Sequence, residues 1–91
     1  MDAILLGRLK EHCHVDHDGD DGQLKDLYAA AVEYLEAAGV PEATNSGSAR
    51  YQLTAFSLVL EWYDGQAALG TATIGVQRLI NQLKLAANPS F

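Results

Sequence analysis

The most apolar stretch of the chain runs from Tyr51 to Tyr63, and its pattern predicts a helix that is buried on most of its circumference. The apolar positions at helical spacing are Leu53, Phe56, Leu60 and Tyr63, with Leu58, Val59 and Trp62 between them. A helix that is apolar on most sides needs several partners, because no single neighbour covers so wide an arc. We therefore expect a central helix over residues 49–63, with the rest of the chain packed around it.

A second segment, between Asp20 and Gly39, has the most regular amphipathic pattern in the chain. Its apolar positions are Leu24, Leu27, Tyr28, Ala31, Val32, Leu35 and Ala38. The charged positions on the opposite side are Lys25, Asp26, Glu33 and Glu36. Asp20 or Asp21 can cap the start of this helix, next to the positive end of its dipole. Gly39 and then Pro41 end it, since proline cannot continue a helix.

Two further helices are predicted towards the ends of the chain. The first covers about residues 2–14, with Asp2 as its N-cap. Its narrow apolar stripe consists of Leu5 or Leu6, Leu9 and Cys13. The last covers about residues 75–85, and its apolar face consists of Val76, Leu79, Ile80 and Leu83. Both patterns have the 3.6-residue period of a helix with one buried side.

The connections are predicted from turn-forming residues. Residues 41–48 read as a polar loop in which Ser46 or Ser48 can cap the central helix, and residues 71–74 read as a short β-prone stretch. The expected fold is therefore a single all-α, four-helix domain over residues 1–91, with a flexible tail at 86–91. The expected core is Leu24, Leu27, Tyr28, Val32, Leu35, Leu53, Phe56, Leu60, Tyr63, Leu79, Ile80 and Leu83.

Composition narrows the classes of function. The formal net charge is −6, and the few basic residues are scattered, which argues against sequence-specific binding of nucleic acid. Cys13 is the only cysteine, so no disulfide can form within the chain, and a reducing compartment is expected. No secretory signal or stretch of about 20 apolar residues is present, so we expect a protein made in the cytoplasm without a membrane segment.

The segment from His12 to Asp21 is rich in groups that bind metals, but it matches no known ligand spacing. An EF-hand loop starting at Asp16 would need glycine and glutamate where this chain has Asp21 and Leu27. A transition-metal site formed by His14, His17 and Asp18 stays open as an alternative, although the spacing fits no zinc pattern.

No catalytic constellation stands out, so we expect a protein that is not an enzyme and needs no cofactor. Cys13 and its neighbours His12 and His14 point in different directions on a helix, so they cannot act as nucleophile and base. The glycines at 65, 70 and 75 lack the lysine of a phosphate-binding loop.

Taken in order, the motifs of this chain resemble the small head–tail connector (adaptor) proteins of tailed bacteriophages and prophages, of the type that sits beneath the portal. The resemblance rests on LLGRLKEHCHVDHD at residues 5–18, the aspartate at 21 that opens the second helix, and AAAVEYLEAAGV at 29–40. It continues through the Tyr51-Gln52-Leu53 entry and the Trp62-Tyr63 pair of the central helix, and ends with IGVQRLINQLK at 74–84. The chain departs from the family pattern at residues 64–66 and at Ile74, which lie in loops and at helix ends.

The resemblance implies a structural protein of the virion, present in the host cytoplasm before assembly. It would form a homo-oligomeric ring that docks on the portal protein and offers a surface to a downstream connector or tail-completion protein. DNA would pass through the ring without sequence-specific binding. The acidic surplus would keep the channel from gripping the duplex if those charges face it.

Two groups of residues are the expected contacts with a neighbouring subunit or the portal. The first is an acidic turn, Asp16, Asp18, Asp20 and Asp21, paired with Arg8 or Lys10 of a neighbour. The second is the tail, with Leu85 and Phe91. The alternative reading is a small acidic helical binding protein, such as a DNA mimic or regulator, which would need carboxylates spaced like phosphates along one face.

Overall fold

A computed structural model describes residues 1–45 and 47–87 of the chain. The helices are α1 (Ala3–His12), α2 (Asp21–Ala37), α3 (Glu42–Asn45), α4 (Ala49–Tyr63) and α5 (Ile74–Ala87). The described residues contain no strand, so the expected mostly helical domain is confirmed.

Short polar side chains fix where two of these helices begin. The Asp2 carboxylate accepts a hydrogen bond of 2.7 Å from the Leu5 N–H at the start of α1. The Ser48 hydroxyl accepts one of 3.1 Å from the Tyr51 N–H at the start of α4. Ser48 is therefore a cap, as one of the two alternatives expected, while Ser46 lies outside the described residues.

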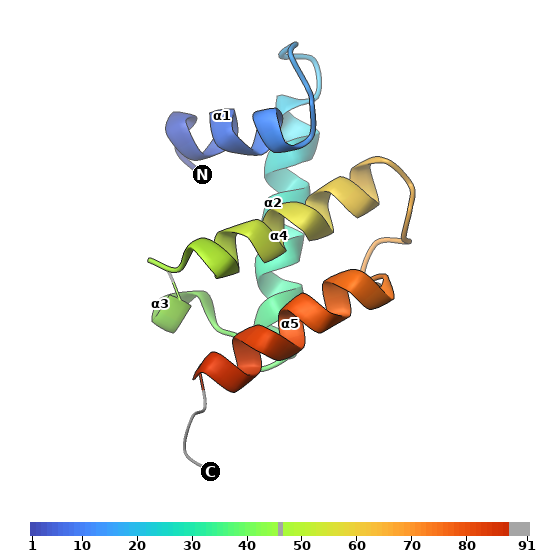
Figure 1. Ribbon diagram of the computed structural model, residues 1–91. Helices are drawn as coiled ribbons and strands as arrows, with labels where there is room; N and C mark the ends of the chain where they lie inside the picture. Colours follow the sequence, from blue (N-terminus) through green and yellow to red (C-terminus); the bar gives the residue numbers. More distant parts are fainter. Residues whose placement is uncertain (46, 88–91) are drawn as a thin grey trace.

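The helices form two layers (Figure 1). Helices α1, α4 and α5 lie side by side, with α4 in the middle, and α2 crosses behind them. The smallest dimension of the molecule is 18 Å, which suits two layers of helices spaced 8–10 Å apart. Each layer therefore has one side that no other helix covers.

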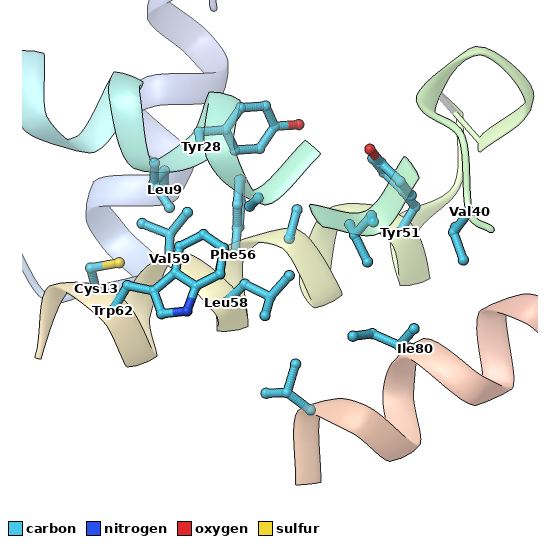
Figure 2. Close-up of a cluster of buried hydrophobic side chains, with 14 of the residues drawn as sticks. Leu9, Cys13, Tyr28, Val40, Tyr51, Phe56, Leu58, Val59, Trp62 and Ile80 are labelled. Atoms are coloured by element: carbon cyan, nitrogen blue, oxygen red, sulfur yellow. The ribbon is translucent and has the colours of Figure 1, made fainter. Parts of the chain in front are cut away.

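The core lies between the two layers, and Figure 2 shows its aromatic centre. The Phe56 ring of α4 packs against rings from α1 and α2. Its centroid lies 6.0 Å from that of Tyr28 in α2 and 5.8 Å from that of His12 in α1. Tyr34 and Trp62 pack edge to face at 6.0 Å. Such aromatic pairs add about 0.5–1.5 kcal/mol each beyond the burial of their area.

Half of the expected core residues are buried, and two expected core leucines are exposed. The expected residues that are buried are Leu24, Tyr28, Leu35, Phe56, Ile80 and Leu83. Those that are only partly buried are Leu27, Val32, Leu60 and Tyr63. Leu53 and Leu79 were wrongly placed in the core, since their exposed fractions are 54% and 37%. Both line an open depression between α4 and α5.

Three expected boundaries also change. The loop at 41–48 contains the short helix α3, and the β-prone stretch at 71–74 forms no strand, because Ile74 already begins α5. Helix α5 continues to Ala87, so the first two residues of the expected tail at 86–91 are helical, and residues 88–91 lie outside the described residues. Helix α1 ends at His12, and His14 adopts a left-handed backbone with φ of 57°. No helix within the described residues is long and apolar enough to cross a membrane.

Candidate functional site

The acidic turn between α1 and α2 forms ion pairs with a lysine of its own chain. The Lys10 ammonium lies 2.7 Å from Asp18 Oδ1 and 2.9 Å from Asp21 Oδ1. Hydrogen bonding to Asp18, and then to Asp21, raises the pKa of Lys10, and the bond from Lys10 lowers the pKa of Asp18. Within the chain, Lys10 therefore pairs with two aspartates of this turn, and the expected pairing of the turn with Arg8 or Lys10 of a neighbouring subunit stays a prediction.

A second tie joins this turn to α4. The Tyr63 hydroxyl donates a hydrogen bond to Asp20 Oδ2 across 43 positions of sequence, and this bond is the main cause that raises the pKa of Tyr63. Within the turn, the Gly19 N–H donates to His17 Nδ1 at 3.1 Å. Of the four aspartates of the expected contact, three therefore already have partners in the chain, and Asp16 is exposed.

The described residues supply no ligand set for the alternative metal site. No group of three or more histidine, cysteine, aspartate and glutamate side chains in residues 1–45 and 47–87 lies close enough together to hold an ion. His17 Nδ1 already accepts a hydrogen bond, and Asp18 is paired with Lys10. Cys13 is buried, and loss of water together with the charge of Asp64 raises the pKa of its thiol to about 11. It is therefore a protonated thiol at neutral pH.

The outer side of α2 carries the other group of carboxylates. Asp26, Glu33 and Glu36 are all exposed, and none of them forms an ion pair among the described residues. The core positions of α2 are Leu24, Tyr28, Ala31 and Leu35. At 100° per residue, Asp26 and Glu33 fall on the side of α2 opposite this core line. We call Asp26, Glu33 and Glu36 the acidic face.

A second surface, on α1, α4 and α5, carries exposed apolar residues beside two arginines. Its members are Ile4 and Arg8 of α1, Arg50 and Leu53 of α4, and Leu79 of α5. They line two separate depressions: Arg50, Leu53 and Leu79 line one between α4 and α5, and Ile4 and Arg8, with Asp2, line another that reaches Gln52 of α4. We call these five residues the arginine face.

The apolar side chains of the arginine face are open to water, and its two arginines have no ion-pair partner in the part of the chain that the structure describes. Ile4, Leu53 and Leu79 are exposed by 74%, 54% and 37%. Arg8 and Arg50 are exposed and form no ion pair among residues 1–45 and 47–87. Apolar side chains left open beside unpaired charges are typical of a surface that binds another protein.

The connection between α4 and α5 depends on two residues of α4 that the sequence pattern did not single out as polar anchors. Glu61 is only 8% exposed, and its carboxylate accepts hydrogen bonds from the N–H and the hydroxyl of Thr73, just before α5. The Trp62 indole N–H donates to the Thr71 carbonyl at 2.8 Å. A glutamate inside an apolar run is the signal that could have revealed this role, because a buried carboxylate requires partners.

A further groove lies between α1, α2 and α3. Its apolar lining comes from Met1, Leu5, Tyr28, Ala29 and Val32, and Lys25 and Glu42 also line it. Near the same helices the hydroxyl of Tyr51 is buried without a hydrogen-bond partner among the described residues. Burial, and then the charge of Glu42, raises the pKa of Tyr51 to about 12, so this phenol stays neutral.

The remaining expected contact residues lie apart from one another. Arg8 is exposed on α1, within the arginine face. Leu85 is 59% exposed near the end of α5. Phe91 lies outside the described residues. The structure therefore brings Lys10 together with the acidic turn.

Comparison of the chain with protein-family models, with curated proteins and with solved structures finds no match.

Proposed function

We propose that this protein is a head–tail connector subunit of a tailed bacteriophage or prophage. In this role it forms a homo-oligomeric ring beneath the portal, extends the channel through which DNA passes, and offers a surface to the next connector or tail-completion protein. It acts as a structural component of the virion and performs no catalysis. The order and spacing of its sequence motifs, from residues 5–18 to 74–84, suggest this role.

The structural observation that supports the proposal most is the arginine face. Leu53 and Leu79 are exposed next to an unpaired arginine at 50, so they can supply the apolar part of a contact with another copy. A ring subunit needs such a surface, because each copy must bind a neighbour. A chain of 91 residues also buries a modest fraction of its surface on folding, so a neighbour adds to its stability.

The alternative of a DNA mimic has weaker support. A mimic needs carboxylates in a row that repeats the spacing of phosphates. In this chain Lys10 and Tyr63 engage three carboxylates of the acidic turn, and the acidic face offers three more. Lys25 lies next to Asp26 in the sequence and interrupts the negative charge.

The test is the native mass of the purified protein, measured alone and after mixing with the portal protein encoded near it. We expect a closed oligomer in at least one of the two conditions and co-migration with the portal. Electron microscopy of the mixture should show an added ring at the end of the portal. A monomer that does not bind the portal in either condition would contradict the proposal and favour the small acidic binding protein.

A further inference from the structure

The two charged faces of the molecule complement each other. The arginine face carries Arg8 and Arg50, and the acidic face carries Asp26, Glu33 and Glu36. Neither set forms an ion pair among the described residues. Asp26 and Glu33 lie opposite the core line of α2, and α2 crosses behind the layer of α1, α4 and α5 that carries the arginine face (Figure 1).

We infer that the arginine face of one copy binds the acidic face of the next copy. Because the two faces are different surfaces of one chain, the contact is head-to-tail, and each copy can bind two neighbours at once. Copies joined in this way form a row, and the closure of that row into a ring rests on the proposed function. It adds the surfaces and the charge pairs that join the subunits.

Charge explains why the occupant is a second copy in this orientation. The chain has a net charge of −6, so two copies repel each other in most orientations. The orientation that sets Arg8 and Arg50 against the carboxylates of α2 replaces this repulsion with attraction. Leu53 and Leu79 then lose their contact with water, which supplies the apolar part of the interface.

The available area is sufficient for both contacts. A stable interface covers about 800 Å² on each partner. The chain exposes 5525 Å², so two such contacts use less than about a third of the surface. Alanines at 29 and 37 are also exposed on α2, and small residues let the apolar side chains of a neighbour approach closely.

The experiment uses full-length protein and two charge-reversal variants, with native mass spectrometry and light scattering as readouts. The arginine-face variant combines Arg8→Glu and Arg50→Glu, and the acidic-face variant combines Glu33→Lys and Glu36→Lys. All four residues are exposed and unpaired in the described chain, so both variants should keep the wild-type circular dichroism and melting temperature of the monomer. Asp16→Lys is the matched control, since Asp16 is equally exposed but lies on neither face.

We expect wild type and Asp16→Lys to form the same large assembly, and each face variant alone to be monomeric, with association weakened at least about tenfold. An equimolar mixture of the two face variants should assemble again, with the two variants alternating in a 1:1 ratio. The intact arginine face of one variant binds the intact acidic face of the other, and the two reversed faces, which have exchanged sign, bind each other. A variant with all four reversals should assemble again, because both faces have exchanged sign.

Several results would overturn the inference. These are wild-type assembly in either face variant, failure of the mixture to assemble when both variants are folded, and a wild type that stays monomeric with and without the portal. The proposed function fails separately. Assembly through these faces without portal binding contradicts the function and leaves the contact intact. A portal-bound ring that survives both face variants contradicts the contact and leaves the function intact.

Discussion

At the scale of single residues, burial sets the chemistry of the one cysteine. Cys13 packs with the core at the end of α1 and is 6% exposed. Loss of water, together with the charge of Asp64, disfavours the thiolate and raises the pKa of the thiol to about 11. Cys13 is therefore a small apolar core residue that reacts slowly with alkylating agents and oxidants.

The raised pKa predicts that stability decreases in alkaline solution. The unfolded chain loses the thiol proton at a lower pH than the folded chain, so the folded state binds more protons in this window, and stability falls as pH rises towards about 11. In urea unfolding, the free energy of unfolding of the wild type should fall by about 1 kcal/mol more than that of Cys13→Ala between about pH 8 and pH 11. This value allows for screening by water. Equal losses in the two proteins, or a thiolate absorbance that rises near the ordinary pKa of cysteine, would contradict this account.

At the scale of elements, the link between α4 and α5 decides where the last helix lies. Glu61 holds Thr73 at the entry to α5, and Trp62 holds the carbonyl of Thr71. These bonds leave the N-terminal end of α5 beside α4, and α5 then covers the core with Val76, Ile80 and Leu83. A buried carboxylate that accepts two hydrogen bonds is favourable only while both donors stay in place.

Replacing Glu61 tests this link. Glu61→Ala should lower the free energy of unfolding by about 1–3 kcal/mol, because the N–H and hydroxyl of Thr73 lose their acceptor. Glu61→Gln should cost less, since an amide oxygen can still accept the N–H, although without the strength that a charge gives. Urea titration followed by Trp62 fluorescence gives these values. Asp16→Asn, at an exposed position outside both faces, is the control and should change stability by less than about 0.5 kcal/mol. If Glu61→Ala were as mild as this control, Glu61 would not hold α5.

At the scale of the whole molecule, two layers of helices leave two surfaces without cover. One is apolar with arginines, and the other is acidic. A monomer with this arrangement gains from association, because binding removes Ile4, Leu53 and Leu79 from water and pairs charges that are otherwise open.

This arrangement predicts a melting temperature that depends on protein concentration. A folded state that binds further copies is stabilised by mass action, so wild type should melt several degrees higher after a roughly hundredfold increase in concentration. The arginine-face variant should melt at one temperature across the same range. Differential scanning fluorimetry at a series of concentrations checks both. Added salt should reduce the dependence in wild type, because screening weakens the charge pairs. A wild-type melting temperature that is constant with concentration would show that association does not stabilise the fold.

The sequence by itself determined the local features of this protein. Helix periods, the caps at Asp2 and Ser48, and the stop after Gly39 predicted the main helices within a few residues, because such signals act over one or two turns. They also predicted most of the core of α2, where a single apolar stripe has one possible buried side.

Only the tertiary structure decided which sides of the helices are covered and which distant groups meet. The apolar pattern of α4 could not show that its Leu53 side is open, since that depends on how many layers surround the helix. Likewise the pairing of Lys10 with Asp18 and Asp21, and the bond from Tyr63 to Asp20, require that the chain return to particular points in space. Hydrophobic period and helix propensity are properties of residues that are neighbours in the sequence. These contacts depend instead on the path of the whole chain in space.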